Sequence, residues 1–311
     1  MVAPMITIRR LADIPEELKG SFVTIGNFDG VHRGHQYLFR HLVRQAREAG
    51  SRAVVLTFEP HPKMILHPDR RPFYLLTTLE EKIALIAAQE VDGLIIIPFS
   101  LEFSRTTAHE FVADLLWGKL RIRKILIGHD YTFGRGKEGN EAFLVSRGEE
   151  LGFGVEVMSA FTDGETIISS TLVRNAVLAG DVSKAAACLG RPYNLVGTVV
   201  AGHRRGASLG FPTANLEPEK VLLPAPGVYA AQAILAGKTY RSVLNIGWNP
   251  TFADERLSVE AHLLDFQGDI YGRTLEVLFY ERLRGERKFD SPAELIAQIG
   301  RDVARAREIL P

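Results

Sequence analysis

The chain has 311 residues, 46% hydrophobic and 24% charged, which is typical of globular domains and not of disordered segments. Lys plus Arg and Asp plus Glu number 37 each, so nothing indicates the uniform basic face that nucleic acid requires. The single Cys188 excludes an internal disulfide, and the sequence has neither a signal-peptide pattern nor an apolar run long enough to span a bilayer. We therefore expect a cytoplasmic protein of two domains that does not bind nucleic acid or membranes.

Short β-branched runs alternate with longer helical patterns in the first part of the chain. Strands are predicted at residues 22–25, 53–58, 94–97, 124–127 and 155–158, and helices at 36–49, 79–88, 108–119, 141–151 and 170–179. The alternation predicts an α/β domain with a doubly wound parallel sheet, in which ligands bind beyond the carboxyl ends of the strands. The loops that follow the strands are therefore the candidate sites.

The stretch from Phe22 to His35 leads from a strand through a glycine-rich turn into a helix, F-V-T-I-G-N-F-D-G-V-H-R-G-H. Its glycines permit a sharp turn and close approach of a ligand, and the amides at a helix start favour phosphate. His32 and His35 are three residues apart, so they point the same way on a helical turn, and Gly34 between them allows a nucleotide to approach. This pattern predicts a phosphate site.

Two other interpretations of the His pair are a zinc site and ordinary helix caps. A zinc site is disfavoured because no Cys lies nearby and no third ligand falls at a recognisable offset. Ordinary capping histidines are the stronger alternative. The position of the pair after a strand, at a helix start and behind G-N-F-D-G favours nucleotide binding.

Three further loops of this domain carry residues suited to a ligand. Thr57–Pro62, T-F-E-P-H-P, is stiffened by prolines and either presents an apolar wall to a planar ring or is only a rigid turn. Gly128–Gly134, G-H-D-Y-T-F-G, combines a carboxylate, aromatic rings and glycines, as ligand loops often do. Ser169–Thr171 are good helix N-caps, and Arg174 one turn later adds a second phosphate clamp.

The pattern changes to strands and turns in the C-terminal part. Strands are predicted at residues 195–200, 228–234, 240–246, 257–264 and 274–280, with one closing helix at 292–309. We expect a small antiparallel β-barrel domain with a C-terminal helix. No internal repeat is found, and the predicted domains are residues 1–186 and 187–311.

Two stretches of the second domain carry candidate chemistry. A glycine-rich loop leads into P-T-A-N, where the Thr213 hydroxyl and the Asn215 amide oxygen are hard ligands suited to Mg²⁺ held with ATP phosphates. Farther on, Glu260, His262 and Leu264 share one face of a predicted strand, and we expect Glu260 to face the barrel interior. The alternative is that Glu260 is an ordinary solvent-facing strand residue.

These motifs together resemble the bacterial bifunctional riboflavin kinase/FAD synthetase family over about residues 5–308. The resemblance implies a nucleotidyltransferase domain that joins AMP from ATP to FMN, giving FAD and pyrophosphate. It implies a second domain that phosphorylates riboflavin to FMN with ATP and Mg²⁺. The alternatives are a flavin-binding regulator, or a different adenylyl- or cytidylyltransferase with a non-catalytic second domain. The oligomeric state is not predicted.

The resemblance also implies roles for individual residues. In that family the His pair stabilises charge on the α-phosphate, and the matching Glu is the general base for the ribityl 5′-hydroxyl. The catalytic residues so implied are His32, His35, Arg174 and Glu260, and the metal ligands are Thr213 and Asn215. The residues implied to bind ATP for adenylylation are Gly26, Asn27, Phe28, Asp29, Gly34, Ser169, Ser170 and Thr171, and those implied to bind FMN are Phe58, Pro60, Pro62, Asp130 and Phe133. The residues implied to bind ATP or flavin in the kinase are Arg205, Gly206, Gly210, Phe211, Pro212, Asn249, Arg284 and Phe289.

One position departs from the family pattern. Members often carry Arg where this chain has Ala207, so the kinase loop has one basic side chain fewer. Arg204 and Arg205 next to it compensate for this loss if they take over the phosphate contact, and we still expect kinase activity.

Overall fold

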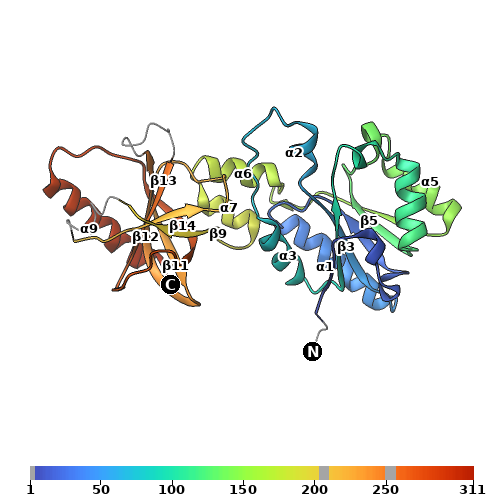
Figure 1. The fold of residues 1–311 in the computed structure, drawn as a ribbon, viewed down its shortest axis with the longest axis horizontal. Coiled ribbons are helices and arrows are strands. Elements are labelled where there is room, and N and C mark those ends of the chain that lie inside the picture. Colours follow the sequence, from blue (N-terminus) through green and yellow to red (C-terminus); the bar gives the residue numbers. More distant parts are fainter. Residues whose placement is uncertain (1–3, 203–209, 249–256) are drawn as a thin grey trace. The chain divides into compact units, whose positions relative to one another are not determined.

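The computed structural model describes residues 4–202, 210–248 and 257–311, and it divides into two compact units (Figure 1). The first unit contains the residues up to Phe73 together with Thr77–Ile168. The second contains Ser169–Pro311 and, from the earlier part of the chain, the short segment Tyr74–Leu76.

A six-stranded parallel sheet in the order β1-β4-β3-β2-β5-β6 forms the centre of the first unit. Its strands are β1 (Ile6–Ile8), β2 (Phe22–Ile25), β3 (Ala53–Glu59), β4 (Gly93–Pro98), β5 (Lys124–Gly128) and β6 (Gly154–Met158). The five predicted strands are confirmed, and the parallel doubly wound class with them. The sequence missed the edge strand β1, because three residues are too few to show a period of two.

Helices cover both faces of this sheet. They are α1 (Arg33–Glu48), α2 (Pro62–Leu66), α3 (Leu79–Ala87), α4 (Ala108–Glu110), which continues as a π-helical segment (Phe111–Lys119), and α5 (Glu141–Leu151). Short 3₁₀ turns (Leu11–Asp13, Glu16–Leu18, Phe103–Arg105, Arg135–Lys137) and a hairpin of β7 (Thr162–Asp163) and β8 (Thr166–Ile167) complete the unit.

The two apolar faces of the strands account for this arrangement. Val54 and Leu56 of β3 pack with the π-helical segment on one face, whereas Ala53 and Val55 pack with α1 and α3 on the other. Because successive strand residues point to opposite faces, a continuous apolar run buries both sides. The sheet is therefore the core of the unit, and its carboxyl edge carries the polar loops.

The second unit is built on a closed antiparallel barrel in the order β10-β13-β12-β11-β14-β9. Its strands are β9 (Tyr193–Val200), β10 (Ala214–Pro218), β11 (Gly227–Leu235), β12 (Lys238–Trp248), β13 (Leu257–Leu263) and β14 (Thr274–Arg284). The predicted barrel and its five predicted strands are confirmed. The sequence placed the stretch that contains β10 in a loop, because its glycines and prolines outweighed a short apolar alternation.

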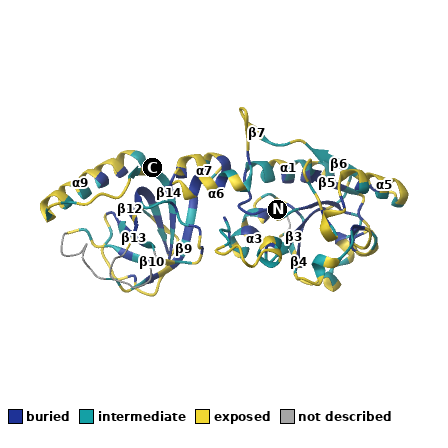
Figure 2. Cartoon of the chain, turned by 90° about the horizontal axis from the view of Figure 1, so that it is seen from above, coloured by how far each residue is buried: buried dark blue, intermediate teal, exposed yellow. Residues whose placement is uncertain are grey.

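Among the residues that the structure describes, this unit also contains the helices α6 (Ser170–Leu178), α7 (Val182–Leu189) and α9 (Pro292–Ile309). Val228 and Ala230 of β11 and Val243 of β12 pack against Ala306 of α9, so this helix covers the outer face of two strands. Its other side is exposed (Figure 2). Helix α7 packs on β14 and β9, whereas the predicted boundary at residues 186 and 187 falls within this helix. The boundary at residues 186 and 187 stays a prediction.

Candidate active sites

The loop between β2 and α1 has an unusual backbone. Phe28 and Val31 have φ angles of 49° and 39°, in the left-handed region that L residues seldom adopt. The Phe28 ring is only 3% exposed and packs edge-on against Phe39 at 4.8 Å. A Cβ on Gly26 would lie 2.8 Å from this ring, so residue 26 must be glycine for the ring to be buried. The loop therefore offers its backbone, not the Phe28 ring, to a ligand.

The structure brings His32 and His35 together at the start of α1. Their rings stack with centroids 3.6 Å apart, and His32 Nδ1 accepts a hydrogen bond from the His35 amide at 3.4 Å. A Cβ on Gly34 would lie 3.1 Å from the His32 ring, so glycine leaves room for it to fold over the helix start. The predicted start at residue 36 is wrong, because the His32 imidazole itself caps a helix that begins at Arg33.

Burial of the His35 ring, reinforced by the nearby His32 ring, holds the pKa of His35 well below its ordinary value. His35 is therefore neutral near physiological pH. Because His32 Nδ1 is an acceptor, a neutral His32 carries its proton on Nε2. The His35 Nδ1 atom is buried and has no hydrogen-bond partner among the described residues. In this state the pair can act as neutral hydrogen-bond donors beside a set of helix N-terminal amides.

A residue that the sequence did not single out holds the same loop. Thr77, 4% exposed, places its amide 3.3 Å and its hydroxyl 3.4 Å from Oδ1 of Asp29. The Thr77 hydroxyl also accepts a hydrogen bond from the Gly30 amide at 3.2 Å. Asp29 is thus 4% exposed and turned into the protein. The only sequence signal for this segment is the T-x-x-E capping box that follows, in which Thr78 and Glu81 cap α3.

The two loops predicted to hold FMN meet through aromatic rings. Phe58 packs against Phe103 at 6.2 Å, which in turn reaches Phe111 at 6.4 Å and then Phe133 at 5.5 Å. Phe133 is 8% exposed, so its ring belongs to the core of the unit. Pro60 and Pro62 are half-buried in the T-F-E-P-H-P loop, where Pro62 begins α2 after the His61 cap.

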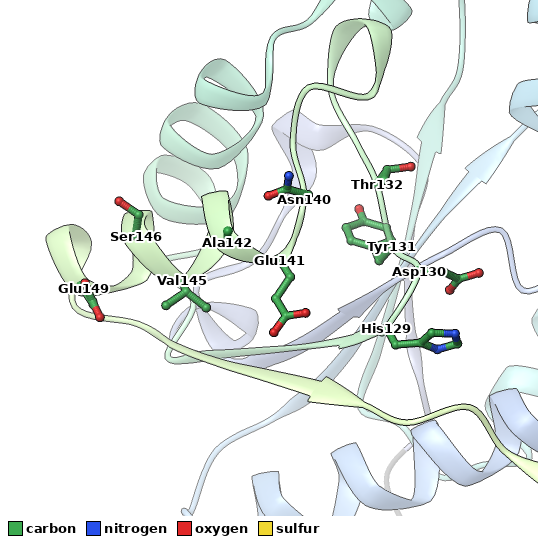
Figure 3. Close-up of a pocket in the computed structure, with 10 residues that line it drawn as sticks. All are labelled: His129, Asp130, Tyr131, Thr132, Asn140, Glu141, Ala142, Val145, Ser146 and Glu149. Carbon is green, nitrogen blue, oxygen red and sulfur yellow. The ribbon is translucent and has the colours of Figure 1, made fainter.

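An open pocket of about 620 Å³ lies next to Asp130, between the loop after β5 and the first turns of α5 (Figure 3). Asp130 is exposed there beside Tyr131, whose buried hydroxyl has no hydrogen-bond partner in the described part of the chain. Burial raises the pKa of Tyr131 far above its ordinary value, so the hydroxyl stays protonated. Glu141 and Asn140 line the other side. The volume lies within the usual range for small-molecule sites.

The predicted phosphate clamp forms the first turn of α6 in the second compact unit. Ser169 is its N-cap, and the Ser169 hydroxyl accepts from the Leu172 amide at 3.2 Å. Ser170 and Thr171 are the first two residues of the helix. Arg174 donates through Nε to the Tyr74 carbonyl at 2.6 Å. The capping role expected for any Ser at this position is therefore present.

In the barrel, Asn215 and Glu260 are direct partners on β10 and β13, and Asn245 of β12 is the partner of Glu260 on its other side. The expectation that Glu260 faces the barrel interior is wrong. The buried residues of β13 are Val259, Ala261 and Leu263, and Glu260 alternates with them on the opposite face, where it is half-buried. Leu264 lies beyond the strand end and is buried.

Polar and aromatic groups surround the cross-strand set of Asn215, Glu260 and Asn245. Thr213 directly precedes β10, and the Asn215 side chain lies against the backbone of Gly202. His262 contacts the Pro212 carbonyl through Nδ1 at 2.8 Å and the Phe211 ring at 5.6 Å. Gly210 has a φ of 86°. Arg205, Gly206, Ala207 and Asn249 lie outside the described residues.

Arg284 is held by the C-terminal helix. Its Nε lies 3.0 Å and its NH2 nitrogen 2.9 Å from Oδ2 of Asp302, which is 5% exposed. The guanidinium groups of Arg284 and Arg287 lie 5.7 and 5.3 Å from the centre of the Phe289 ring. Most of the Arg284 fork is therefore used to fix the loop after β14, which leaves it less free to bind phosphate.

Among the described residues, no group of three His, Cys, Asp or Glu side chains is placed to hold a metal ion. The donors near β10 are instead a hydroxyl, an amide oxygen and one carboxylate, the hard set that suits Mg²⁺ when substrate phosphates supply the other ligands. Within the described ranges, no helix has the length and apolarity needed to cross a bilayer.

Comparisons with known proteins match the two parts of the chain to two different family models. The family model described as FAD synthetase matches residues 14–172, and the one described as riboflavin kinase matches residues 189–310. A crystal structure described as a macrolide-efflux protein from Streptococcus pneumoniae has a TM-score of 0.89 and 35% identity, covering 98% of this chain and 99% of its own.

Two curated relatives carry the same paired name. The bifunctional riboflavin kinase/FMN adenylyltransferase of Escherichia coli (strain K12) is 40% identical over 302 residues, 97% of this chain and 96% of the relative. The protein of that name from Bacillus subtilis (strain 168) is 36% identical over 299 residues, 94% and 93% of the two chains. The chain therefore belongs to the family of bifunctional riboflavin kinases/FMN adenylyltransferases, with the adenylyltransferase in its N-terminal part and the riboflavin kinase in its C-terminal part.

Proposed function

We propose that FMN is adenylylated at the loop between β2 and α1, where the stacked His32 and His35 rings carry the assignment. A phosphate oxygen of FMN attacks the α-phosphorus of ATP, and pyrophosphate leaves. Preorganised hydrogen-bond donors aimed at the charge that develops in this step are the main means of acceleration. The two imidazoles and the first amides of α1 supply such donors. Burial lowers the pKa of His35 in the absence of ligand, and the negative charge of a bound polyphosphate would oppose this effect.

The other residues of this site have supporting roles in the proposal. Backbone groups of Gly26–Asp29 approach the ATP phosphates, and Gly34 leaves the helix start open. Ser169, Ser170 and Thr171 bind the triphosphate through the N-terminal amides and hydroxyls of α6, and Arg174 adds the positive charge of its guanidinium group. FMN lies against the apolar wall of Phe58, Pro60 and Pro62, with Asp130 at its polar edge, and the buried Phe133 ring supports this region from the core.

In the kinase we propose that Glu260 is the general base for the 5′-hydroxyl of riboflavin. The cross-strand pairing of Asn215 with Glu260 carries this assignment, because it brings an amide oxygen beside the carboxylate. Thr213 and Asn215 would hold Mg²⁺, which offsets phosphate charge when bound. Gly210, Phe211, Pro212 and Phe289, with Arg205, Gly206 and Asn249, border ATP and flavin. Arg284 acts there by fixing the Phe289 loop.

Flavin chromatography tests the pair of assignments. The protein is incubated with riboflavin, ATP and Mg²⁺, and FMN followed by FAD is expected. Omission of Mg²⁺, with a chelator present, should stop the first step. Formation of FMN at the same rate without any divalent cation would contradict the metal assignment.

We also propose a cytoplasmic location, which the use of ATP and the presence of a single cysteine, the buried Cys188, support. Fractionation of cells that express the chain, with detection in the cytoplasmic fraction, tests this location.

A further inference from the structure

Lys82 is a buried cation that the chemistry above does not use. It is 6% exposed and lies in the first turn of α3, whose N-cap is Thr78. Burial lowers the pKa of Lys82, and the Glu59 and Asp29 carboxylates oppose this effect. The positive end of the helix dipole also disfavours a cation at this position. Neither burial nor helix formation therefore explains a lysine here.

The contacts of Lys82 lead to the T-F-E-P-H-P loop. Its Nζ donates to the Phe58 carbonyl at 3.3 Å and lies 3.6 Å from Oε2 of Glu59. Phe58 and Glu59 are the last residues of β3, directly before Pro60. One ammonium group thus fixes both the backbone and the carboxylate where this loop leaves the sheet.

The same short stretch also holds the loop between β2 and α1. Thr77 binds Asp29 and the Gly30 amide, five residues before Lys82 in the chain. A third link joins the two loops directly, because the Thr57 hydroxyl donates to the Asn27 carbonyl at 3.2 Å. The start of α3 therefore lies between the two loops and contacts both.

We propose that Lys82 is a positioning residue for FMN adenylylation: it sets the Phe58–Pro62 loop, which holds FMN, against the Gly26–Gly30 loop, which holds ATP. This inference rests on the proposed assignment of those loops. Lys82 acts through the Phe58 carbonyl and Glu59 and not by touching the reacting atoms. Such positioning matters because displacement of the attacking phosphate by about 1 Å can cost on the order of 10² in rate.

Lys82→Met tests the proposal, since it keeps most of the length and burial of the side chain and removes the ammonium. We expect kcat/KM for FAD formation to fall roughly 10- to 100-fold, with a rise in the KM for FMN. The KM for riboflavin and the rate of riboflavin phosphorylation should stay within about twofold of the parent values. Both depend on the riboflavin kinase, which lies in the other compact unit of the same chain.

Lys124→Met is the matched control. Lys124 is another partly buried lysine of the first unit, ion-paired with Glu156 at 2.5 Å on β5 and β6, and it contacts neither loop. It should lower the melting temperature and leave FAD kinetics unchanged. Wild-type FAD kinetics in Lys82→Met, or an equal loss in both variants, would overturn the proposal.

Glu59→Gln is the second variant. It removes the carboxylate partner of Lys82 and tests the proposal if Lys82→Met does not fold. It should show the same rise in the KM for FMN, roughly three- to tenfold, and an unchanged KM overturns the proposal. His35→Ala tests separately whether the loop between β2 and α1 is the adenylylation site. If this assignment is wrong, His35→Ala will still make FAD. If His35→Ala is inactive and folded Lys82→Met is normal, the loops are correctly assigned and only the role of Lys82 is wrong.

Discussion

Asn215 on β10 and Glu260 on β13 are direct cross-strand partners on the outer face of the barrel. Side chains at such positions have Cβ atoms about 4.5–5.5 Å apart, so the register brings amide and carboxylate together whatever their rotamers. Both alternate with buried residues, Ala214 and Leu216 on β10 and Val259 and Ala261 on β13. The strand register that buries these core residues therefore also sets the positions of Asn215 and Glu260 relative to each other.

Glu260→Gln should separate the two activities. The substitution preserves shape and hydrogen bonding but removes the basicity that, in the proposed role of Glu260, accepts the riboflavin hydroxyl proton. FMN production should fall roughly 10²- to 10⁴-fold, whereas FAD synthesis from supplied FMN should not change. Both rates are measured by chromatography on one preparation. Near-normal phosphorylation would return Glu260 to a polar strand residue, and equal loss of both activities would indicate misfolding.

Much of the fold could be predicted from the sequence because its signals are periodic. The apolar runs of β2 to β6 and the helical patterns of α5 and α9 indicated the element types, and the predicted bounds of β2, α5 and α9 are exact. The starts of α1 and β10 could not be predicted in the same way. A capping histidine was among the interpretations of the His pair, but the sequence does not show which of the two rings caps the helix, and it is His32 that does so. A short strand among glycines and prolines depends on its partners for stability.

The same distinction between local signals and tertiary contacts applies to the candidate sites. The His pair and the P-T-A-N stretch are local motifs, and they can be recognised from the sequence. Thr77 and Lys82 cannot be recognised in this way. In the sequence, a threonine near a helix start indicates a cap, and a lysine there indicates a solvated face. Their burial and their contacts with Asp29 and Phe58 arise from tertiary packing. The outward direction of Glu260 likewise depends on which face of β13 the barrel buries.

His35→Ala should stop FAD formation while FMN still accumulates. Loss of one preorganised donor typically costs roughly 10²- to 10³-fold in rate. The measurement is FAD formation from supplied FMN and ATP, with riboflavin phosphorylation as the internal control. His109→Ala is a matched control at an exposed histidine of α4 that the proposal gives no role. An undiminished rate of FAD formation in His35→Ala would show that the assignment of this site is wrong.

A fragment that begins at Ser169 should fold and phosphorylate riboflavin, because it keeps the helices that pack with the barrel. A fragment that begins at Ala185 cuts into α7 and loses Val182, which is 0% exposed. We expect its melting temperature to be lower, since cavities left by buried side chains are costly. Equal melting temperatures would contradict the role given to α7. A folded but inactive Ser169 fragment, beside an active full-length protein, would show that the kinase requires the first unit.

The last prediction concerns acid stability of the first unit and begins from Glu156 on β6. Burial alone would raise the pKa of Glu156, but hydrogen bonds from Lys124, Gln45 and His41 outweigh it and lower the pKa to about 2. A carboxyl whose pKa is lower in the folded than in the unfolded state stabilises the fold above its unfolded pKa of 4.5. That contribution is lost as pH falls from 4.5 toward 2.

Glu156→Gln should therefore lower the free energy of unfolding near neutral pH by on the order of 2 kcal/mol, and the difference from the parent should shrink as pH falls through this window. Urea unfolding followed at Trp117, one of two tryptophans, reports on the first unit if both proteins also carry Trp248→Phe. Glu90→Gln is the control, because its ion pair with Arg47 is exposed and should contribute little. A difference that is independent of pH between 2 and 6 would show that Glu156 stabilises the unit by packing and not by its charge.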